Sequence, residues 1–531
     1  MSALSWLKSF AAPKTPKNGK RIYDNAKYQG HVWGGPNAFA SASADVDLNS
    51  SREVLRRRSR HAYQNGASAR AIVEGLVALI VSTGIDVAPD TGDENKDKAI
   101  REQFLMWVEC ADASGRCDFW ELQRQACRSM VLSGEFLWQI CSIDDPSRPI
   151  PFAIQALEAD QLSDTPVVDV AAGNSFCAGV ESDQYGKPVF YHILSAPLDQ
   201  FTAPMGGTNV PNTGGVKANG AIMRPQITGA RIPAERIIHG FEPTRPGQTR
   251  GEPWLAPVLG TLHQERQLVD TELTSAKIGA APAMAIKTSG SGWPGASDPN
   301  FTDVNGQGQR QYDFTPGAVA VLGENEEIQV LKNDRPSQMI APFRTMLRGD
   351  LAGAMRIPQR YIDRDCSRAN YSSMRADMLD TRRLLDPVQG LFGRLAAKKV
   401  YELAFLQLST AAGLRIPRAN TPELRSMMRC KVHPDGWAYV DPEKDVRAAT
   451  AAIAAGLSNF TDEAQRRGGD IDQIWKQLAA DNAKAKALGV EPALGGMAAK
   501  PEEPEAADMA DDAAVTDNSA PETPVTVGEA T

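Results

Sequence analysis

Two long helical patterns, separated by a segment of different composition, constrain the fold of this chain most. The first begins after the turn-rich residues 243–251, with Pro253 at a position suited to the first turn of a helix. Its apolar residues recur at spacings of three, four and seven, and Arg266 stands among them. They are Leu255, Leu259, Leu262, Val269, Leu273 and Ala276. One apolar stripe of this kind predicts a helix, over 253–281, that packs against a helical neighbour.

The segment between the two helices reads as a small β insertion. Residues 289–317 are rich in Gly, Ser, Asp and Pro, and they precede two strand-like runs, 318–322 and 328–331, around the turn 323–326. The second helical pattern then runs over 337–356, with Pro342 in its first turns, and ends before Ile357 and Pro358.

A third, much longer helical pattern follows a polar loop. The loop covers 363–370, and the helical pattern runs from 372 to 408 with Pro387 inside it. Because proline has no N–H to donate, Pro387 predicts a kink.

The remaining segments indicate a mixed helix and sheet chain. Helical patterns cover 52–64 and 67–83, with a break at Asn65–Gly66, and further patterns cover 104–110 and 119–132. Strand-like runs stand at 136–140, 152–156, 189–194, 237–241 and 428–432. Helices are expected at 443–455 and 462–488, the latter with Thr461 as N-cap. The fold class is therefore α+β.

Composition assigns most of the 531 residues to folded protein. Hydrophobic residues make up 42% and charged residues 23%, which is typical of soluble globular chains of three or four domains, or of one elongated molecule. No apolar run reaches the roughly 18 residues that a bilayer span needs, and no secretory signal is recognisable, so we expect no membrane partner. Seven cysteines at irregular spacing predict reduced thiols in a cytoplasmic setting.

The charge is distributed unevenly along the chain. The net charge is −8, but residues 501–531 hold nine acidic residues and no basic one, so residues 1–500 carry 57 basic against 56 acidic residues. We expect 494–531 to be a disordered acidic tail and 1–50 an extended arm. A nearly neutral body is no generic polycation, so any contact with DNA must come from local patches.

The motifs of catalysis are missing from the sequence. There is no G-x-x-x-x-G-K-[ST] for phosphate, no H-E-x-x-H for zinc and no G-x-S-x-G elbow. A single histidine such as His239, at a strand end, is expected to be a hydrogen-bonded structural residue. The sequence therefore predicts no catalytic residue, no metal ligand and no cofactor.

Two groups of arginines remain. Arg52, Arg56, Arg57, Arg58 and Arg60 lie in one helix, where a solvated or inter-subunit face is favoured over a nucleic-acid contact. A longer series consists of Arg344, Arg348, Arg356, Arg360, Arg364 and Arg368. Arg344 and Arg348 share a helix face at i,i+4 spacing. On a monomer such a stripe is ordinary surface, whereas around the axis of a ring it gives stacked rings of charge, and the residues alone do not decide between these.

Three sets of motifs, in this order, resemble the bacteriophage portal proteins of the lambda type. The first is 237–243 (IIHGFEP) with 247–251 (GQTRG) and the helix through 262–276. The second is 356–361 with 371–376 (YSSMRA), and the third is 454–458 with 463–468 (EAQRRG). Together they cover roughly residues 50 to 490.

The resemblance implies a portal fold and a ring of about twelve subunits at one capsid vertex, through which double-stranded DNA is packaged and ejected. It divides the chain into an arm (1–50), an α/β wing (51–252), a first stem helix (253–281), a β-containing clip (282–335) and a second stem helix (336–358). The rest of the chain is divided into a tunnel loop (359–371), a kinked wing helix with a return strand (372–440), crown helices (441–493) and the acidic tail (494–531).

The resemblance also implies partners and site residues. The DNA-facing residues would be Arg344, Arg348, Arg356, Arg360, Arg364, Arg368 and Asn370. Docking in the clip would use Trp293, Asp298, Asp303 and Arg310. Expected partners are the terminase large subunit, which would hydrolyse ATP, the major capsid protein and scaffold, and head–tail connector proteins. The protein would be assembled in the host cytoplasm and become part of the virion.

Two other classes stay open as alternatives. A capsid-processing protease or a nuclease needs a Ser–Lys pair or carboxylates around a metal, and no such constellation stands out. Another ring-forming virion component, such as a head–tail adaptor or a capsid subunit, would usually lack two stem helices around a small β insertion.

Overall fold

The computed structural model describes residues 43–195, 229–280, 339–367, 370–419, 421–437 and 442–489. It also gives six short strands elsewhere in the chain, β7 (Lys217–Ala218), β8 (Ala221–Ile222), β11 (Met284–Thr288), β12 (Phe301–Asp303), β13 (Arg310–Tyr312) and β14 (Glu326–Val330). The chain divides into two units, Met1–Gly468 and Gly469–Thr531. The predicted arm up to residue 42 and the acidic tail lie outside the described residues.

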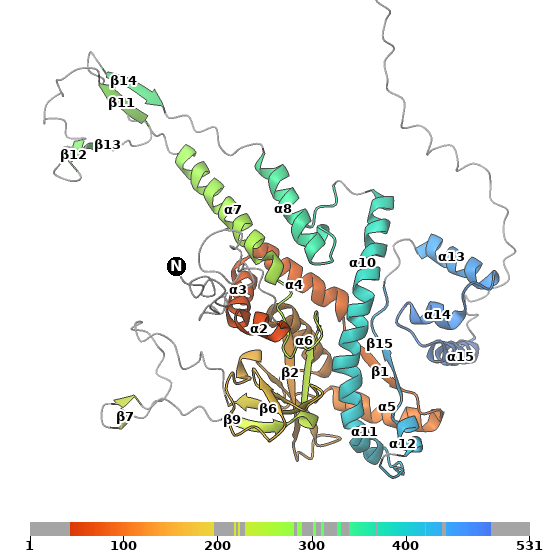
Figure 1. The fold of residues 1–531 in the computed structure, drawn as a ribbon. Helices are drawn as coiled ribbons and strands as arrows, with labels where there is room; N and C mark the ends of the chain where they lie inside the picture. The colour runs from red at the N-terminus through yellow and green to blue at the C-terminus, as the bar shows by residue number, and fades with distance from the viewer. Residues whose placement is uncertain are drawn as a thin grey trace, which may run out of the picture. The chain divides into compact units, whose positions relative to one another are not determined.

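From residue 43 the described part of the first unit contains the helices α2 (Ala44–Asn49), α3 (Arg52–Asn65), α4 (Ala67–Ile80), α5 (Glu94–Val108) and α6 (Phe119–Ser133), with one strand between α4 and α5 (Figure 1). The predicted break at Asn65–Gly66 is confirmed, because Gly66 ends α3 and precedes α4. A side chain there would bring its Cβ to 2.7 Å from the carbonyl oxygen of Ala62. Asp118 and Glu121 form a capping box at the start of α6. Helix α5 begins ten residues before the predicted 104–110, and Asp93 caps it.

Three antiparallel sheets follow these helices. Strand β2 (Glu135–Ser142) lies between β3 (Phe152–Leu157) and β10 (Ile237–Phe241). A second sheet has the order β4 (Ser175–Cys177), β5 (Val180–Ser182), β6 (Pro188–Leu194) and β9 (Gly229–Pro233). Strand β1 (Asp86–Pro89) pairs with β15 (Cys430–His433), which joins segments far apart in the sequence. The predicted strands 136–140, 152–156, 189–194 and 237–241 are confirmed; 428–432 begins two residues late, because Met428 ends a helix.

One aromatic core unites the helices with the central sheet. Trp107, Phe119 and Trp138 are buried in it, and the indole N–H of Trp107 donates to the carbonyl of Phe152 at 2.8 Å. Phe392 and Tyr401, from the long helical region near residue 400, pack into the same core. The mixed helix and sheet class is therefore confirmed.

The two predicted long helices are α7 (Leu259–Ala280), preceded by the short η6 (Ala256–Val258), and α8 (Ile340–Ala354). Helix α7 starts later than predicted, because the helical turn opens at Ala256, with Pro257 as its second residue, and not at Pro253. The strand prediction for 328–331 is shifted: β14 ends at Val330 and pairs antiparallel with β11, which had not been predicted. The predicted partner 318–322 lies outside the described residues. Strands β12 and β13 form a second antiparallel pair.

The long helical pattern at 372–408 is confirmed as three consecutive helical segments. These are α10 (Tyr371–Phe392), the π-helical η7 (Gly393–Lys398) and α11 (Lys399–Ala411). Helix α10 continues through Pro387, and the departure from α-helical hydrogen bonding comes at η7, six residues later. A short helix, α9 (Arg360–Asp363), occupies part of the predicted tunnel loop.

The C-terminal helices differ from prediction in their boundaries. They are α12 (Pro422–Met427), α13 (Pro442–Ala454) and α14 (Phe460–Gln465), and the second unit holds α15 (Ile471–Ala487). The N-cap of α14 is Asn459, whose side chain accepts from the N–H of Asp462 at 2.8 Å, and not Thr461. The predicted helix 462–488 is interrupted at Gly468, which has a left-handed φ of 74°. Within the described ranges, no helix is both long and apolar enough to span a membrane.

Candidate functional site

A buried carboxylate joins α7 to α8. Glu265 of α7 accepts hydrogen bonds from Nε of Arg344 at 3.0 Å and from Nε of Arg348 at 2.9 Å, both on the same oxygen. The two arginines do share a helix face, as their i,i+4 spacing predicts, and that face contacts α7. Burial alone would raise the pKa of Glu265, but hydrogen bonds from Ser68, Arg344 and Arg348 outweigh burial and lower the pKa. Ser68 belongs to α4, so this carboxylate connects three helices.

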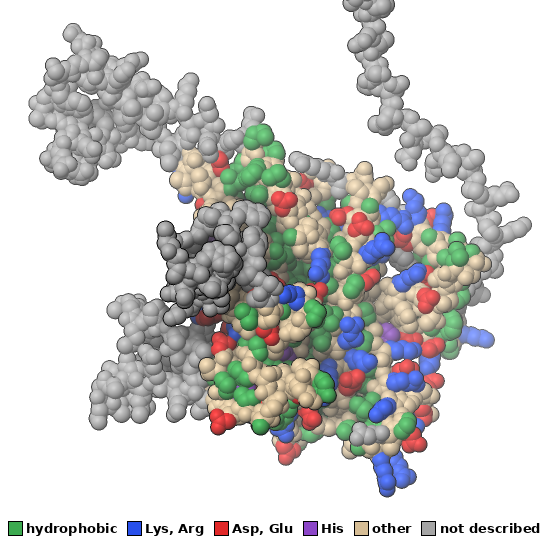
Figure 2. All heavy atoms as spheres, in the orientation of Figure 1, with side chains coloured by type: hydrophobic (Ala, Val, Ile, Leu, Met, Phe, Trp, Pro, Cys, Tyr) green, Lys and Arg blue, Asp and Glu red, His purple; other side chains and the backbone are tan. Residues whose placement is uncertain are grey.

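The outer side of the α7–α8 pair is apolar and uncovered. On α8 and just before it, Met339, Phe343 and Met346 are 69%, 46% and 54% exposed. Their spacing of four and three residues places them on one stripe. Leu273 of α7 is also exposed. Figure 2 shows hydrophobic side chains grouped in the region of α7 and α8. Uncovered apolar area of this kind is typical of a surface that another chain covers.

Two arginines with left-handed backbone mark the connection from α8 to α10. Arg356 follows α8 with φ of 59°, and Arg364 ends α9 with φ of 57°. Glycine is the usual residue in this position, because a Cβ is strained there. Nη1 of Arg356 pairs with Oε1 of Glu242 at 3.2 Å. Arg364 is exposed, and its guanidinium lies 6.0 Å from the ring centre of Tyr361.

The neighbouring predicted residues have structural contacts of their own. Arg360 lies 3.9 Å from the carboxylate of Asp377. Asn370 caps α10, where its side chain accepts from the N–H of Ser373 at 2.7 Å. Tyr361 fixes α9 against α4, since a Cβ on Gly75 would lie 3.3 Å from its ring. Arg368, Trp293 and Asp298 lie outside the described residues, whereas Asp303 and Arg310 are paired in register across β12 and β13.

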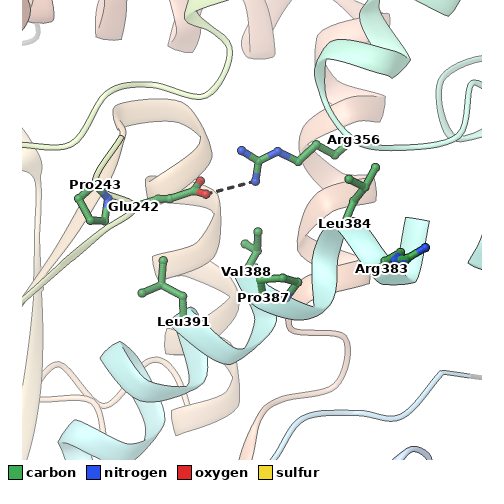
Figure 3. Close-up of a pocket in the computed structure, with 8 residues that line it drawn as sticks. All are labelled: Glu242, Pro243, Arg356, Arg383, Leu384, Pro387, Val388 and Leu391. Carbon is green, nitrogen blue, oxygen red and sulfur yellow. Dashed lines mark hydrogen bonds and ion pairs between the residues drawn. The ribbon is translucent and has the colours of Figure 1, made fainter. Parts of the chain in front are cut away.

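A pocket of about 440 Å³ opens where the segment after β10 meets α10 (Figure 3). Its floor is apolar, and the ion pair between Glu242 and Arg356 crosses one side. The lining residues are Glu242, Pro243, Arg356, Arg383, Leu384, Pro387, Val388 and Leu391. The motif residues Glu242 and Pro243 thus lie beside the helix that contains Pro387, although nearly 150 residues separate them.

The first arginine cluster belongs to a buried ionic network, which corrects the expectation of a solvated or inter-subunit face. Arg52 and Arg56 are buried, and Arg56 pairs with Asp160 at 2.8 Å and lies 3.5 Å from Glu135. Arg60 pairs with Glu158 at 2.7 Å. Spacing of four places these three arginines on one face, which packs inward. Arg57, on the other side, is exposed and pairs with Glu53.

Glu135 is the centre of that network and was not singled out from the sequence. Its carboxylate is fully buried and accepts from Nε of Arg250 at 2.9 Å, from the N–H of Gly251 at 3.0 Å and from Nε2 of His239 at 2.9 Å. The prediction that His239 is a hydrogen-bonded structural residue is therefore confirmed. Burial would raise the pKa of Glu135, but the charge of Arg250 and the hydrogen bonds of His239 and Arg250 hold it well below its usual range.

The described residues offer no obvious metal centre. They contain no group of three or more His, Cys, Asp or Glu side chains arranged to hold a metal ion. All seven cysteines are unpaired in the structure.

Comparison of the sequence with known protein families identifies the family to which the chain belongs. The model of the family described as "Phage portal protein, lambda family" matches residues 37–389. That range includes the buried network, the α7–α8 pair, the left-handed arginines and most of α10.

Curated relatives agree with this match. The chain is 26% identical to a probable portal protein of Halomonas phage phiHAP-1 over 464 residues, which cover 85% of this chain and 84% of the relative. It is 22% identical to portal protein B of Escherichia phage lambda over 440 residues, covering 77% of this chain and 78% of the relative. A portal protein of Escherichia phage N15 is 23% identical and aligns over 50% of this chain and 53% of its own length.

Solved structures of gene transfer agent particles also align with this chain. A chain in the virion of the native particle has a TM-score of 0.41 at 15% identity, covering 83% of this chain and 94% of that one. A chain in the neck of the native particle, computed with C12 symmetry, has a TM-score of 0.42 at 15% identity, covering 87% and 95%. Because the family model spans well over half of the sequence, the chain belongs to the lambda family of phage portal proteins.

Proposed function

We propose that about twelve copies of this phage portal protein close into a ring at one capsid vertex, and that double-stranded DNA enters and leaves the capsid through the ring. As in the rest of its family, the protein is a structural component of the virion. The observation that carries the proposal is the α7–α8 pair. It is fastened internally by Glu265, yet it leaves the stripe of Met339, Phe343 and Met346 uncovered. A second copy that covers this stripe would build a wall of paired helices.

The subdivision of the chain follows from this assignment. We assign 51–252 to the wing, α7 and α8 to the stem, the β11–β14 insertion to the clip, 359–371 to the tunnel loop, α10 to α11 and β15 to the wing, and α13 to α15 to the crown. The terminase large subunit, which would supply ATP hydrolysis, and later the connector proteins would dock on the clip through Trp293, Asp298, Asp303 and Arg310. The major capsid protein and scaffold would surround the ring during assembly in the host cytoplasm.

The ion pairs suggest which arginines face DNA. Arg344, Arg348, Arg356 and Arg360 each lie beside a carboxylate of the same chain, whereas no described carboxylate pairs with Arg364. A conduit must not hold DNA tightly, because every fixed phosphate contact raises affinity and slows movement. An exposed arginine without a described carboxylate partner, with Arg368 four residues later in the sequence and Asn370 at the end of the loop, suits such a pore. We assign the DNA contact mainly to Arg364 and Arg368.

The test is the oligomeric state of the full chain, by native mass spectrometry and negative-stain images. We expect a closed ring of about twelve or thirteen subunits with a central hole. The double variant F343D/M346D should give monomers or small oligomers, because it places charges in the uncovered stripe. The matched control is L105D on α5, at a side chain of similar exposure, 43%, and it should form rings. A wild-type chain that stays monomeric or dimeric at every salt concentration would refute the ring.

A further inference from the structure

The segment after the long helix has an unusual excess of positive charge. Residues 412–431 contain five Lys and Arg against one Glu, although the body of the chain is nearly neutral. Arg415, Arg418, Arg425 and Arg429 are all exposed. Most buried and half-buried arginines in the described ranges pair with a carboxylate, but none of these four has a hydrogen bond or ion pair with a described acidic side chain. We call these four residues the α12 arginine surface.

The α12 arginine surface is held in place by the core. Thr421 caps α12 by accepting from the N–H of Leu424, and Pro422 occupies the first turn. The apolar side chains of the segment, Leu414, Leu424, Met427 and Met428, pack against the main core. Strand β15, which follows directly, pairs with β1. The arginines therefore project from a fixed backbone and not from a free loop.

The four arginines are close in the sequence and on both sides of a short helix. Arg425 stands in the last turn of α12, where the helix dipole favours a cation, and Arg429 follows two residues after the helix ends. A polyanion that contacts the surface would supply the negative charge that no described carboxylate of the chain supplies to these four side chains. Arginine is the residue best suited to phosphate, since its planar guanidinium donates two parallel hydrogen bonds.

The surrounding residues favour duplex nucleic acid among polyanions. Residues 406–436 contain no Phe, Trp or Tyr, so the surface has no platform on which unpaired bases could stack, as single-strand binders require. Among the described residues 407–437, no large hydrophobic side chain is exposed, so an acidic peptide would find charge but no apolar pocket for its side chains. The phosphate backbone of a duplex, in contrast, can bind to the positive charges alone.

The surface also lies far from the connection that we assign to the tunnel. Residues 371–411 form one continuous helical stretch through α10, η7 and α11, and the 22 residues of α10 alone span about 33 Å at 1.5 Å each. The loop before Tyr371 is at one end of that helical stretch, and α12 follows its other end (Figure 1). DNA in the tunnel and DNA on α12 would therefore be two different contacts.

We propose that the α12 arginine surface binds the phosphate backbone of duplex DNA outside the tunnel. The contact is independent of sequence, because no side chain there is positioned by a second residue to read a base edge. Every subunit carries the surface, so the proposal does not require a closed ring. In a ring it would give a repeated set of contacts for DNA that has already passed through or lies beside the portal.

The test uses covalently closed circular plasmid DNA, because a closed circle cannot thread a closed ring. Binding of the full-length protein is measured by co-sedimentation or gel shift at 50 to 200 mM salt, with R415Q/R418Q/R425Q/R429Q as the variant. The control, R57Q/K98Q/R116Q/K187Q, removes the same number of exposed charges from scattered positions. Native mass spectrometry of all three proteins separates a loss of binding from a loss of assembly.

We expect wild type and control to bind the circle, and the variant to bind it about tenfold or more weakly at 50 mM salt. The slope of log affinity against log salt should also fall by about 3 to 4, since each lost phosphate contact removes roughly 0.9. Equal loss in variant and control, or a wild type that binds linear DNA but not the circle, would overturn the proposal. Displacement of the circle by poly-glutamate at a lower charge concentration than by duplex DNA would assign the surface to an acidic protein instead.

Discussion

At the scale of single residues, a group of buried charged side chains is the most prominent feature of this chain. Glu135 and Arg250 are both fully buried, and His239 completes the set of partners. Such a group stabilises only while every partner is present, because an uncompensated buried charge is much more costly than an exposed one. The motif around residues 237–251 therefore acts through the position of its polar groups, and not through catalysis.

We expect E135Q to lower the free energy of unfolding by about 3 to 5 kcal/mol, since it leaves Arg250 buried without its counter-charge. Thermal unfolding of the full chain measures the change. E53Q, which alters an exposed i,i+4 pair with Arg57, is the control and should unfold at the wild-type temperature. Equal melting temperatures for E135Q and wild type would show that the network does not stabilise the fold.

The lowered pKa of Glu135 predicts how the stability of the fold depends on pH. The pKa of Glu135 in the folded chain lies well below its ordinary value of 4.5, so the unfolded chain binds the proton more readily. The stabilisation is therefore complete above about pH 5 and is lost as the pH falls through the folded pKa. In acid titrations followed by tryptophan fluorescence, the difference in stability between wild type and E135Q should shrink below pH 4. A difference that stays constant from pH 7 to pH 3 would contradict this.

The two left-handed arginines allow stability and function to be separated. R364G should keep or raise the melting temperature, because glycine adopts a φ of 57° without strain, whereas R364V should lower the stability by roughly 1 kcal/mol. If Arg364 touches DNA, both variants reduce the yield of DNA-filled capsids, and R364K restores it. A yield that follows the melting temperature across the three variants would mean that the backbone, and not the charge, is what matters.

At the scale of elements, the pairing of α7 with α8 depends on one acceptor. We expect E265Q to lower stability by about 2 kcal/mol, since one neutral carbonyl then serves both Arg344 and Arg348. Hydrogen exchange should become faster in α8 before it does so in α5 or α6. D270N, on the exposed side of α7 and 3.9 Å from Arg266, is the control. Exchange that accelerates evenly across the chain would argue against a local role.

Element positions also show what sequence reasoning can recover. Strand Ile237–Phe241 and the start of α6 follow from local sequence patterns, and their predicted bounds agree with the structure. The i,i+4 face of Arg344 and Arg348 was equally local and correct. Their partner, however, lies 79 and 83 residues earlier, and Glu135 lies 115 residues from Arg250. Spacing gives the face on which a charge stands, but only tertiary packing supplies the opposite charge.

At the scale of the whole molecule, the order of parts was the most informative feature of the sequence. Helix, β insertion, helix and long interrupted helix follow one another as expected, and the family match covers most of that series. What stayed hidden was the inward direction of the Arg52, Arg56 and Arg60 face, because its counter-charges come from residues 135–164. The pairing of β11 with β14 was missed for a similar reason, since the nearer run 318–322 looked like the natural partner.

The antiparallel pairing of β11 with β14 has a consequence for how such a protein can diversify. The first and last strands of the insertion are joined to each other, so the backbone that leaves α7 is tied to the backbone that enters α8. In the sequence, residues 289–325 stand between these two paired strands, and we call them the cassette. We expect related chains to exchange, lengthen or shorten this cassette to suit a different docking protein, while the helices on either side keep their register.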